Sequence, residues 1–174
     1  FKLKYTSCNR ACYCRGKCWR NPYFRISYDI AHLKSDTQEY HESGLIERYP
    51  VDTTKLKMKN LKLFEEEQVN PQNMEYLGRL IDFCRENDIQ FVAVTTPIPI
   101  NTLQAYSDNY NAAWKYFGQY FDEHEVTYLN FNTQYFKAFS HDLSDYTDFD
   151  GHMNGNAAKE YSKVLANILK GEGV

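Results

Sequence analysis

Between residues 70 and 131, segments with helical spacing of apolar residues alternate with segments typical of strands. Residues 71–87 are expected to form an amphipathic helix, with Asn70 as its N-cap and Pro71 at its first position. Its expected buried residues are Leu77, Leu80, Ile81 and Cys84. Residues 89–95 follow as a run of mostly β-branched and aromatic residues. Such a run is typical of a strand buried on both faces, as in parallel sheets covered by helices.

The same alternation continues to the end of the chain. Residues 104–125 are expected to form a second amphipathic helix, residues 126–131 a second strand and residues 157–170 a final helix. Six residues of the second helix are expected to form core rather than a binding groove: Tyr106, Tyr110, Ala113, Phe117, Tyr120 and Phe121. Helices and strands alternating in this way predict right-handed crossovers on a parallel sheet. We therefore expect an α/β domain.

Residues 1–60 have a different composition from the α/β core expected at 70–170. Phe1–Tyr5 alternates apolar and basic residues, as in a short strand, and a short helix is plausible around Tyr28–Leu33. Four cysteines fall within eleven residues: Cys8, Cys12, Cys14 and Cys18. Their spacing matches no common zinc motif, and disulfides in an exported protein are favoured over a metal site or free thiols, which stay open. We expect one domain over residues 1–174, with a Cys- and Tyr-rich irregular region at 1–60.

Composition excludes some classes of function. The 174 residues carry a net charge of −3, and the pI is about 6.0, so no basic surface for nucleic acid is indicated. No run of about 18 apolar residues is present to span a bilayer. Because the chain begins with Phe1 and not Met, we expect that the natural N-terminus was removed. An upstream membrane anchor in the full-length protein is an open hypothesis.

The candidate chemistry lies just before the final helix. The stretch Asp148-Phe149-Asp150-Gly151-His152 places two carboxylates and an imidazole in five residues, and Asn154 is a candidate N-cap. A His held by a turn ahead of a packed helix can act as a base, and a nearby carboxylate can fix its tautomer. The competing interpretation is that the acids and Asn154 only cap the helix while His152 fills a turn.

This block resembles the last conserved motif of SGNH (GDSL-type) hydrolases, in particular the branch of D-alanyl-lipoteichoic-acid transfer proteins and related cell-surface acyltransferases and esterases. The resemblance covers about Pro71 to Leu169. It implies a three-layer, flavodoxin-like domain with a mainly parallel sheet flanked by helices. An open alternative is that this sheet lacks its first strand. The family's usual Asp-x-x-His spacing is absent. The resemblance implies Asp150, which stands in an Asp-x-His spacing, as the carboxylate that orients His152, with Asp148 as the alternative.

The remaining site residues implied by the resemblance are a Ser nucleophile and groups that bind substrate. The nucleophile follows the first strand in this family, where the chain has Ser7 without the usual Gly, so a Ser upstream of Phe1 is favoured over Ser7. Thr95 ends the first predicted core strand and Thr96 follows it, at the sheet edge where α/β folds bind ligands. Thr95, Thr96 and Asn154 are the candidate substrate-binding residues.

The resemblance implies an esterase or acyltransferase acting on acyl groups of a bacterial cell-envelope glycan, a similar polymer or a small ester. No cofactor and no metal are expected. An extracytoplasmic or cell-surface location is implied, while a cytoplasmic one stays open. The alternative function is a non-catalytic binding or assembly domain on the same scaffold, with its Tyr-rich surface as the contact site. A weaker third hypothesis is metal binding by the cysteine cluster.

Overall fold

The computed structural model describes residues 34–41, 44–59, 61 and 63–171. The chain divides into two compact units, one up to Glu47 and one from Arg48 onward. The strand β1 (Gln38–Tyr40) pairs with β2 (Ile46–Arg48) in a two-stranded sheet. In the first unit, Nε2 of His41 lies 2.6 Å from a carboxylate oxygen of Glu47. The cysteine cluster, Ser7 and the segments predicted at Phe1–Tyr5 and Tyr28–Leu33 lie outside the described residues.

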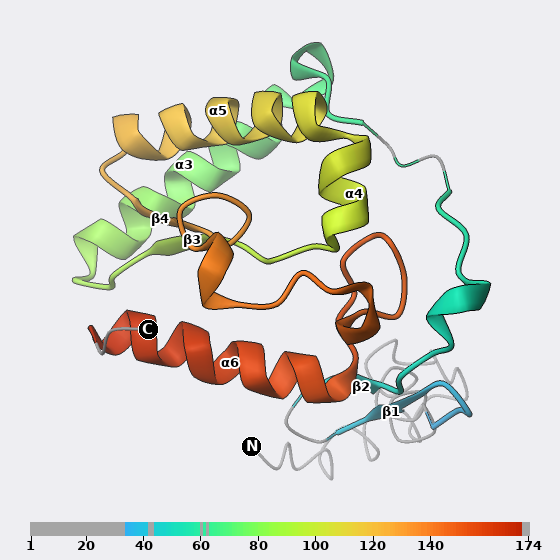
Figure 1. The fold of residues 1–174 in the computed structure, drawn as a ribbon. Helices are drawn as coiled ribbons and strands as arrows, with labels where there is room; N and C mark the ends of the chain where they lie inside the picture. The colour runs from blue at the N-terminus through green and yellow to red at the C-terminus, as the bar shows by residue number, and fades with distance from the viewer. Residues whose placement is uncertain (1–33, 42–43, 60, 62, 172–174) are drawn as a thin grey trace, which may run out of the picture. The chain divides into compact units, whose positions relative to one another are not determined.

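Among the described residues, the α-helices and the parallel strands belong to the second unit (Figure 1). Its elements are, in order, the 3₁₀ turns η1 (Thr53–Lys55) and η2 (Glu66–Gln68), α3 (Pro71–Glu86), β3 (Val92–Thr95), α4 (Ile100–Ala105), α5 (Ser107–Glu123), β4 (Thr127–Asn130), the 3₁₀ turns η3 (Phe136–Ala138) and η4 (Leu143–Asp145), and α6 (Gly155–Lys170). Among the described residues, no helix is both long enough and apolar enough to cross a bilayer.

The strands β3 and β4 pair in parallel, in a register that places Val92 opposite Thr127 and Thr95 opposite Asn130. Side chains of a strand alternate between its two faces, and the two apolar clusters follow this alternation. Ala93 packs with Ile81 of α3 and Phe121 of α5, whereas the β4 residue Leu129 packs with Tyr161 of α6. Helices therefore lie on both faces of the pair (Figure 1). The predicted mixed α/β class with a parallel sheet is confirmed, and the larger three-layer arrangement stays a prediction.

The helix starts and ends show where local sequence was sufficient. Asn70 caps α3 by accepting a hydrogen bond from the backbone N–H of Gln72, and Pro71 occupies the first turn, as predicted. The buried Cys84 is also as predicted. Leu80, in contrast, is 49% exposed, because it lies at the flank of the buried stripe that Leu77, Ile81 and Cys84 form.

The prediction of a single helix over residues 104–125 was wrong in its extent, because the structure has two helices, α4 and α5, in this region. The helix begins at Ile100, directly after Pro99, and Tyr106 interrupts it with φ −129° and ψ 29°. Thr102, which is fully buried, donates from Oγ1 to the carbonyl oxygen of Phe149 at 2.7 Å. Because this contact joins residues 47 positions apart, the helical periodicity of the sequence could not indicate the separate direction of α4.

Candidate functional site

The candidate site lies in the long loop between β4 and α6, at a tight turn closed by backbone contacts. Tyr146 and Met153 form an isolated antiparallel bridge, and the N–H of Thr147 donates to the carbonyl oxygen of His152 at 2.8 Å. Below this bridge, the N–H of Asn154 donates to the carbonyl oxygen of Asp145 at 2.9 Å. The five residues from Asp148 to His152 thus form the tip of a closed turn.

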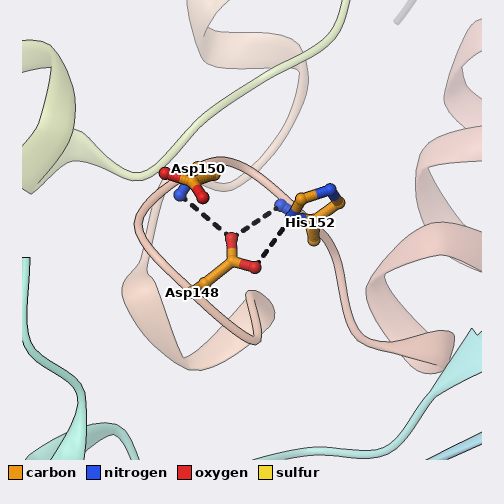
Figure 2. A group of neighbouring side chains, drawn as sticks. All are labelled: Asp148, Asp150 and His152. Atoms are coloured by element: carbon orange, nitrogen blue, oxygen red, sulfur yellow. Dashed lines mark hydrogen bonds and ion pairs between the residues drawn. The ribbon is translucent and has the colours of Figure 1, made fainter. Parts of the chain in front are cut away.

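Asp148 is the carboxylate that contacts the imidazole (Figure 2). Its Oδ2 lies 2.7 Å from Nδ1 of His152, while its Oδ1 accepts from the backbone N–H groups of Asp150 at 2.9 Å and His152 at 3.2 Å. Because a carboxylate only accepts hydrogen bonds, Nδ1 carries the proton in this contact. One side chain therefore both shapes the turn and holds the ring.

This geometry corrects the preference for Asp150 as the orienting acid. Asp150 is exposed, and among the described residues its carboxylate makes no hydrogen bond to the ring. The reason is the backbone at Gly151, whose φ of +95° turns the chain back so that the residue four before His152 faces the imidazole. An Asp-x-His spacing cannot reveal which way the intervening turn folds.

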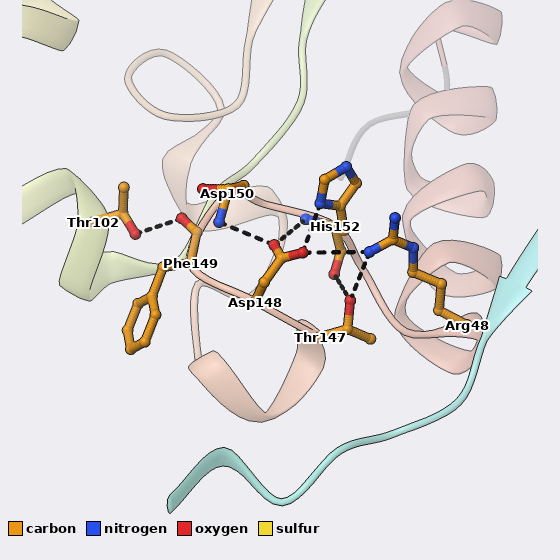
Figure 3. Close-up of polar contacts among 7 residues, drawn as sticks. All are labelled: Arg48, Thr102, Thr147, Asp148, Phe149, Asp150 and His152. Carbon is orange, nitrogen blue, oxygen red and sulfur yellow. Dashed lines mark hydrogen bonds and ion pairs between the residues drawn. The ribbon is translucent and has the colours of Figure 1, made fainter. Parts of the chain in front are cut away.

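Arg48 adds a positive charge at the carboxylate oxygen of Asp148 that contacts His152 (Figure 3). Its Nη1 lies 3.3 Å from Oδ2 of Asp148 and 3.2 Å from Oγ1 of Thr147, and Oγ1 of Thr147 donates to the carbonyl oxygen of His152 at 3.1 Å. The side chains of Arg48 and Asp148 are 34% and 30% exposed, so the pair is only partly screened by water. No sequence signal marks Arg48, which precedes Asp148 by 100 residues.

The hydrogen bonds at Asp148 keep it ionised. Burial raises the pKa of its carboxyl. Hydrogen bonds from the side chain and backbone of His152 and from the backbone of Asp150 lower that pKa, and together they outweigh the effect of burial. The pKa therefore lies below the usual value for Asp. A carboxyl whose pKa is lower in the folded than in the unfolded state stabilises the fold above the unfolded value. This stabilisation is lost as the pH falls through the folded pKa. Because that pKa is lowered, His152 keeps an anionic partner at neutral pH.

The turn is fixed against the segment that follows β3. A Cβ atom at Gly151 would lie 2.6 Å from Cγ2 of Ile98, so only glycine fits here without displacing a neighbour. Ile98 itself is held by the side chain of Asn132, whose Oδ1 accepts from the Ile98 N–H at 3.0 Å. These contacts place the turn beside the loops at the carboxyl ends of β3 and β4, where parallel sheets collect ligand-binding residues.

The other predicted site residues have mostly structural contacts. Oδ1 of Asn154 accepts from the N–H groups of Asn156 at 3.1 Å and Ala157 at 3.0 Å, which confirms it as the N-cap of α6, and its Nδ2 donates to the carbonyl oxygen of Ser144. Both ends of its buried amide are therefore engaged with the backbone. Oγ1 of Thr95 lies 2.6 Å from the hydroxyl of Tyr128. Thr96 is exposed, and its carbonyl oxygen accepts from Nδ2 of Asn132 at 2.8 Å.

Asn132 and His141 are the residues that sequence reasoning missed. Both are buried polar residues, at 6% and 8% exposure, in a loop where such burial requires hydrogen bonds. The available signal was the position of Asn132 just after a predicted strand, which is a site for polar groups at the sheet edge. His141 had no comparable signal, because its partners are the carbonyl oxygens of Ile98 and Phe136 and not side chains.

Asp148, Asp150 and His152 also have the donor atoms of a possible cation site, since one ligand atom from each lies within 4.8 Å of the others. Carboxylate oxygens and imidazole nitrogens do bind divalent metals. Both oxygens of Asp148, however, already accept hydrogen bonds, and Arg48 lies against Oδ2. A cation bound by these three residues would have to compete with that guanidinium, so the arrangement favours orienting an imidazole over binding metal.

Comparison with protein-family models, with curated proteins and with solved structures gave no match. The SGNH resemblance therefore depends on the residues of the chain itself and stays a prediction.

Proposed function

We propose that Asp148 and His152 form the general-base pair of an SGNH-like esterase or acyltransferase, which acts on acyl groups of a cell-envelope glycan or a similar polymer. The observation that carries the proposal is the 2.7 Å contact between Nδ1 of His152 and the Asp148 carboxylate. It fixes the tautomer in which Nε2 has a free lone pair. The ring is accessible to a substrate, since the His152 side chain is 53% exposed.

In this proposal, Nε2 takes the proton of a Ser hydroxyl while the oxygen attacks the ester carbonyl. The imidazolium that results is stabilised by Asp148, and it returns the proton to the alcohol that leaves. Water or an acceptor hydroxyl, deprotonated by the same nitrogen, then releases the acyl group. Among the described residues, no Ser hydroxyl is hydrogen-bonded to His152, so in this proposal the nucleophile is a Ser outside those residues.

The surrounding fold supports this assignment. A parallel strand pair with helices on both faces fits the centre of a three-layer domain, and the turn lies at the edge where such domains react with their substrates. An extracytoplasmic location at the cell surface is part of the same proposal, because the polymer substrate is found there.

The test is hydrolysis of p-nitrophenyl acetate by the longest natural form of the protein. We expect His152→Ala to lower the rate by about 10²- to 10⁴-fold, the usual contribution of a positioned general base. Asp148→Asn should also lower the rate strongly, because Asn does not stabilise an imidazolium. Asp150→Asn is the matched control, since that carboxylate does not contact the ring, and its rate should stay close to that of the natural protein.

Equal rates in the natural protein and in His152→Ala would overturn the esterase proposal and favour a non-catalytic binding domain. That alternative has one observation in its favour. Tyr76, Leu80 and Phe83 form an exposed apolar stripe on α3, with exposures of 54%, 49% and 57%. Exposed apolar stripes of this kind often mark contact surfaces.

A further inference from the structure

A small pocket of about 110 Å³ lies beside the corner between α4 and α5. Leu61, Leu63 and Phe64 form one wall, and Tyr106, Tyr110 and Ala113 form the other. The first wall belongs to a segment without helix or strand, and the second to the start of α5 and the residue before it. The predicted packing role of the aromatic face of residues 104–125 is therefore incomplete, because part of that face lines a pocket.

Side-chain contacts keep the first wall in place. Oδ1 of Asn109 accepts from the N–H of Phe64 at 2.9 Å, and its Nδ2 donates to the carbonyl oxygen of Phe64 at 2.8 Å, as a neighbouring strand would. The Phe64 ring packs on Tyr116 and Phe117, with centroids 5.6 and 5.9 Å away. The pocket is thus built before any ligand arrives, which lowers the entropic cost of binding.

The lining selects a neutral and largely apolar ligand. None of the lining residues is charged, and the amide of Asn109 is occupied by the Phe64 backbone. Burial raises the pKa of Tyr110, and so does the negative charge of Asp150, so its hydroxyl stays protonated and can donate. The volume is somewhat below that of an engineered apolar cavity of about 150 Å³ that binds benzene, so a chain of a few carbons fits.

The pocket is linked to the Asp148–His152 turn through α4. The negative charge of Asp150 contributes to the raised pKa of Tyr110. In addition, α4 contacts the turn through Thr102, whose hydroxyl donates to the carbonyl of Phe149, and α4 ends at the pocket residue Tyr106.

We propose that this pocket binds a short, neutral aliphatic acyl chain, the acyl part of the ester that reacts at His152. The inference depends on the proposed function for the identity of the ester, but not for the binding of the chain. It makes Tyr110 and Ala113 residues that determine acyl specificity.

The test is binding of hexanamide, an uncharged acyl analogue that the site does not hydrolyse. Binding is measured by the change in tryptophan fluorescence. Trp114 is suited to report on the pocket because its ring lies 5.7 Å from that of Tyr110, and Trp19→Phe removes the other of the two tryptophans. We expect a saturable change in emission. Ala113→Phe should fill the pocket and weaken binding by at least about tenfold. Ala112→Phe, at an exposed position of the same helix, is the matched control and should bind as the parent does.

Hexanoate should bind more weakly than hexanamide, because its carboxylate meets an uncharged lining near Asp150. Tyr110→Phe keeps the ring and removes only the hydroxyl, so a several-fold loss is expected there even if Ala113→Phe does not fold. Absence of saturable binding, or equal affinities for the parent, Ala113→Phe and Tyr110→Phe, would overturn the inference. Binding is measured in a His152→Ala background, so the result does not depend on esterase activity. Failure of this inference and failure of the esterase proposal can therefore be told apart.

Discussion

The sheet core and the site loop of the second unit are ordered by different forces. In the core, apolar side chains of α3, α5 and α6 are buried against β3 and β4 on two faces. Burial of this kind is nondirectional and roughly proportional to area, so the core tolerates changes in detail. The loop from Phe131 to Asn154 has only short 3₁₀ turns, and its buried polar groups must find individual partners.

His141 shows how the loop satisfies this requirement. Its two ring nitrogens lie 2.7 Å from the carbonyl oxygen of Ile98 and 3.2 Å from that of Phe136, and its ring stacks on Phe136 with a centroid distance of 4.1 Å. Asn132, Asn154 and Asp148 have similar roles at other points. The geometry of the site therefore depends on a few directional contacts, and single substitutions should test it.

The largest effect is expected for Gly151→Ala. An L residue in the left-handed region costs about 1–2 kcal/mol, and the overlap with Ile98 adds about 1–3 kcal/mol of overpacking. Gly171→Ala is the matched control, because Gly171 has φ +74° but no atom within 4 Å of its Cβ position. Urea unfolding should therefore show a clearly larger loss of unfolding free energy at Gly151. Equal losses would mean that the contact with Ile98 does not hold the turn.

An intermediate effect is expected for Asn154→Ala, which removes both the cap of α6 and the hydrogen bond to Ser144. We expect a loss of about 2 kcal/mol, the upper end for N-caps. Asn70→Ala removes only the exposed cap of α3 and should cost about 1 kcal/mol. Thermal or urea unfolding of the two variants measures the difference, and a greater loss at Asn70 would contradict the importance given to loop contacts.

The smallest effects should have opposite signs at two buried tyrosines. Tyr146 in the loop donates to the carbonyl oxygen of Ser140 at 3.0 Å, so Tyr146→Phe should cost about 1 kcal/mol. Tyr161 faces the core, where burial raises its pKa to about 12, and its hydroxyl has no hydrogen-bond partner among the described residues. Tyr161→Phe should therefore be neutral or stabilise the fold by up to about 1 kcal/mol. Destabilisation by both changes to the same extent would indicate a partner for the Tyr161 hydroxyl.

Local patterns were sufficient to predict much of the core and the start of the last helix. Asn70, Pro71 and Asn154 were recognised as helix-start signals, and the two strands were located within a few residues. The site was located to a five-residue stretch, but its internal pairing was not. Asp148 and not Asp150 holds the ring because the turn at Gly151 is set by its contact with Ile98, more than 50 residues earlier in the chain.

The sequence alone thus determined the α/β class, the helix caps and the location of the candidate imidazole, because these depend on residue spacing within one or two turns of the backbone. Tertiary structure decided the break between α4 and α5, the choice of carboxylate, the approach of Arg48 and the pocket beside Tyr110. Each of these depends on contacts between segments about 45 to 100 residues apart, and no spacing rule along a single chain records which distant groups will meet.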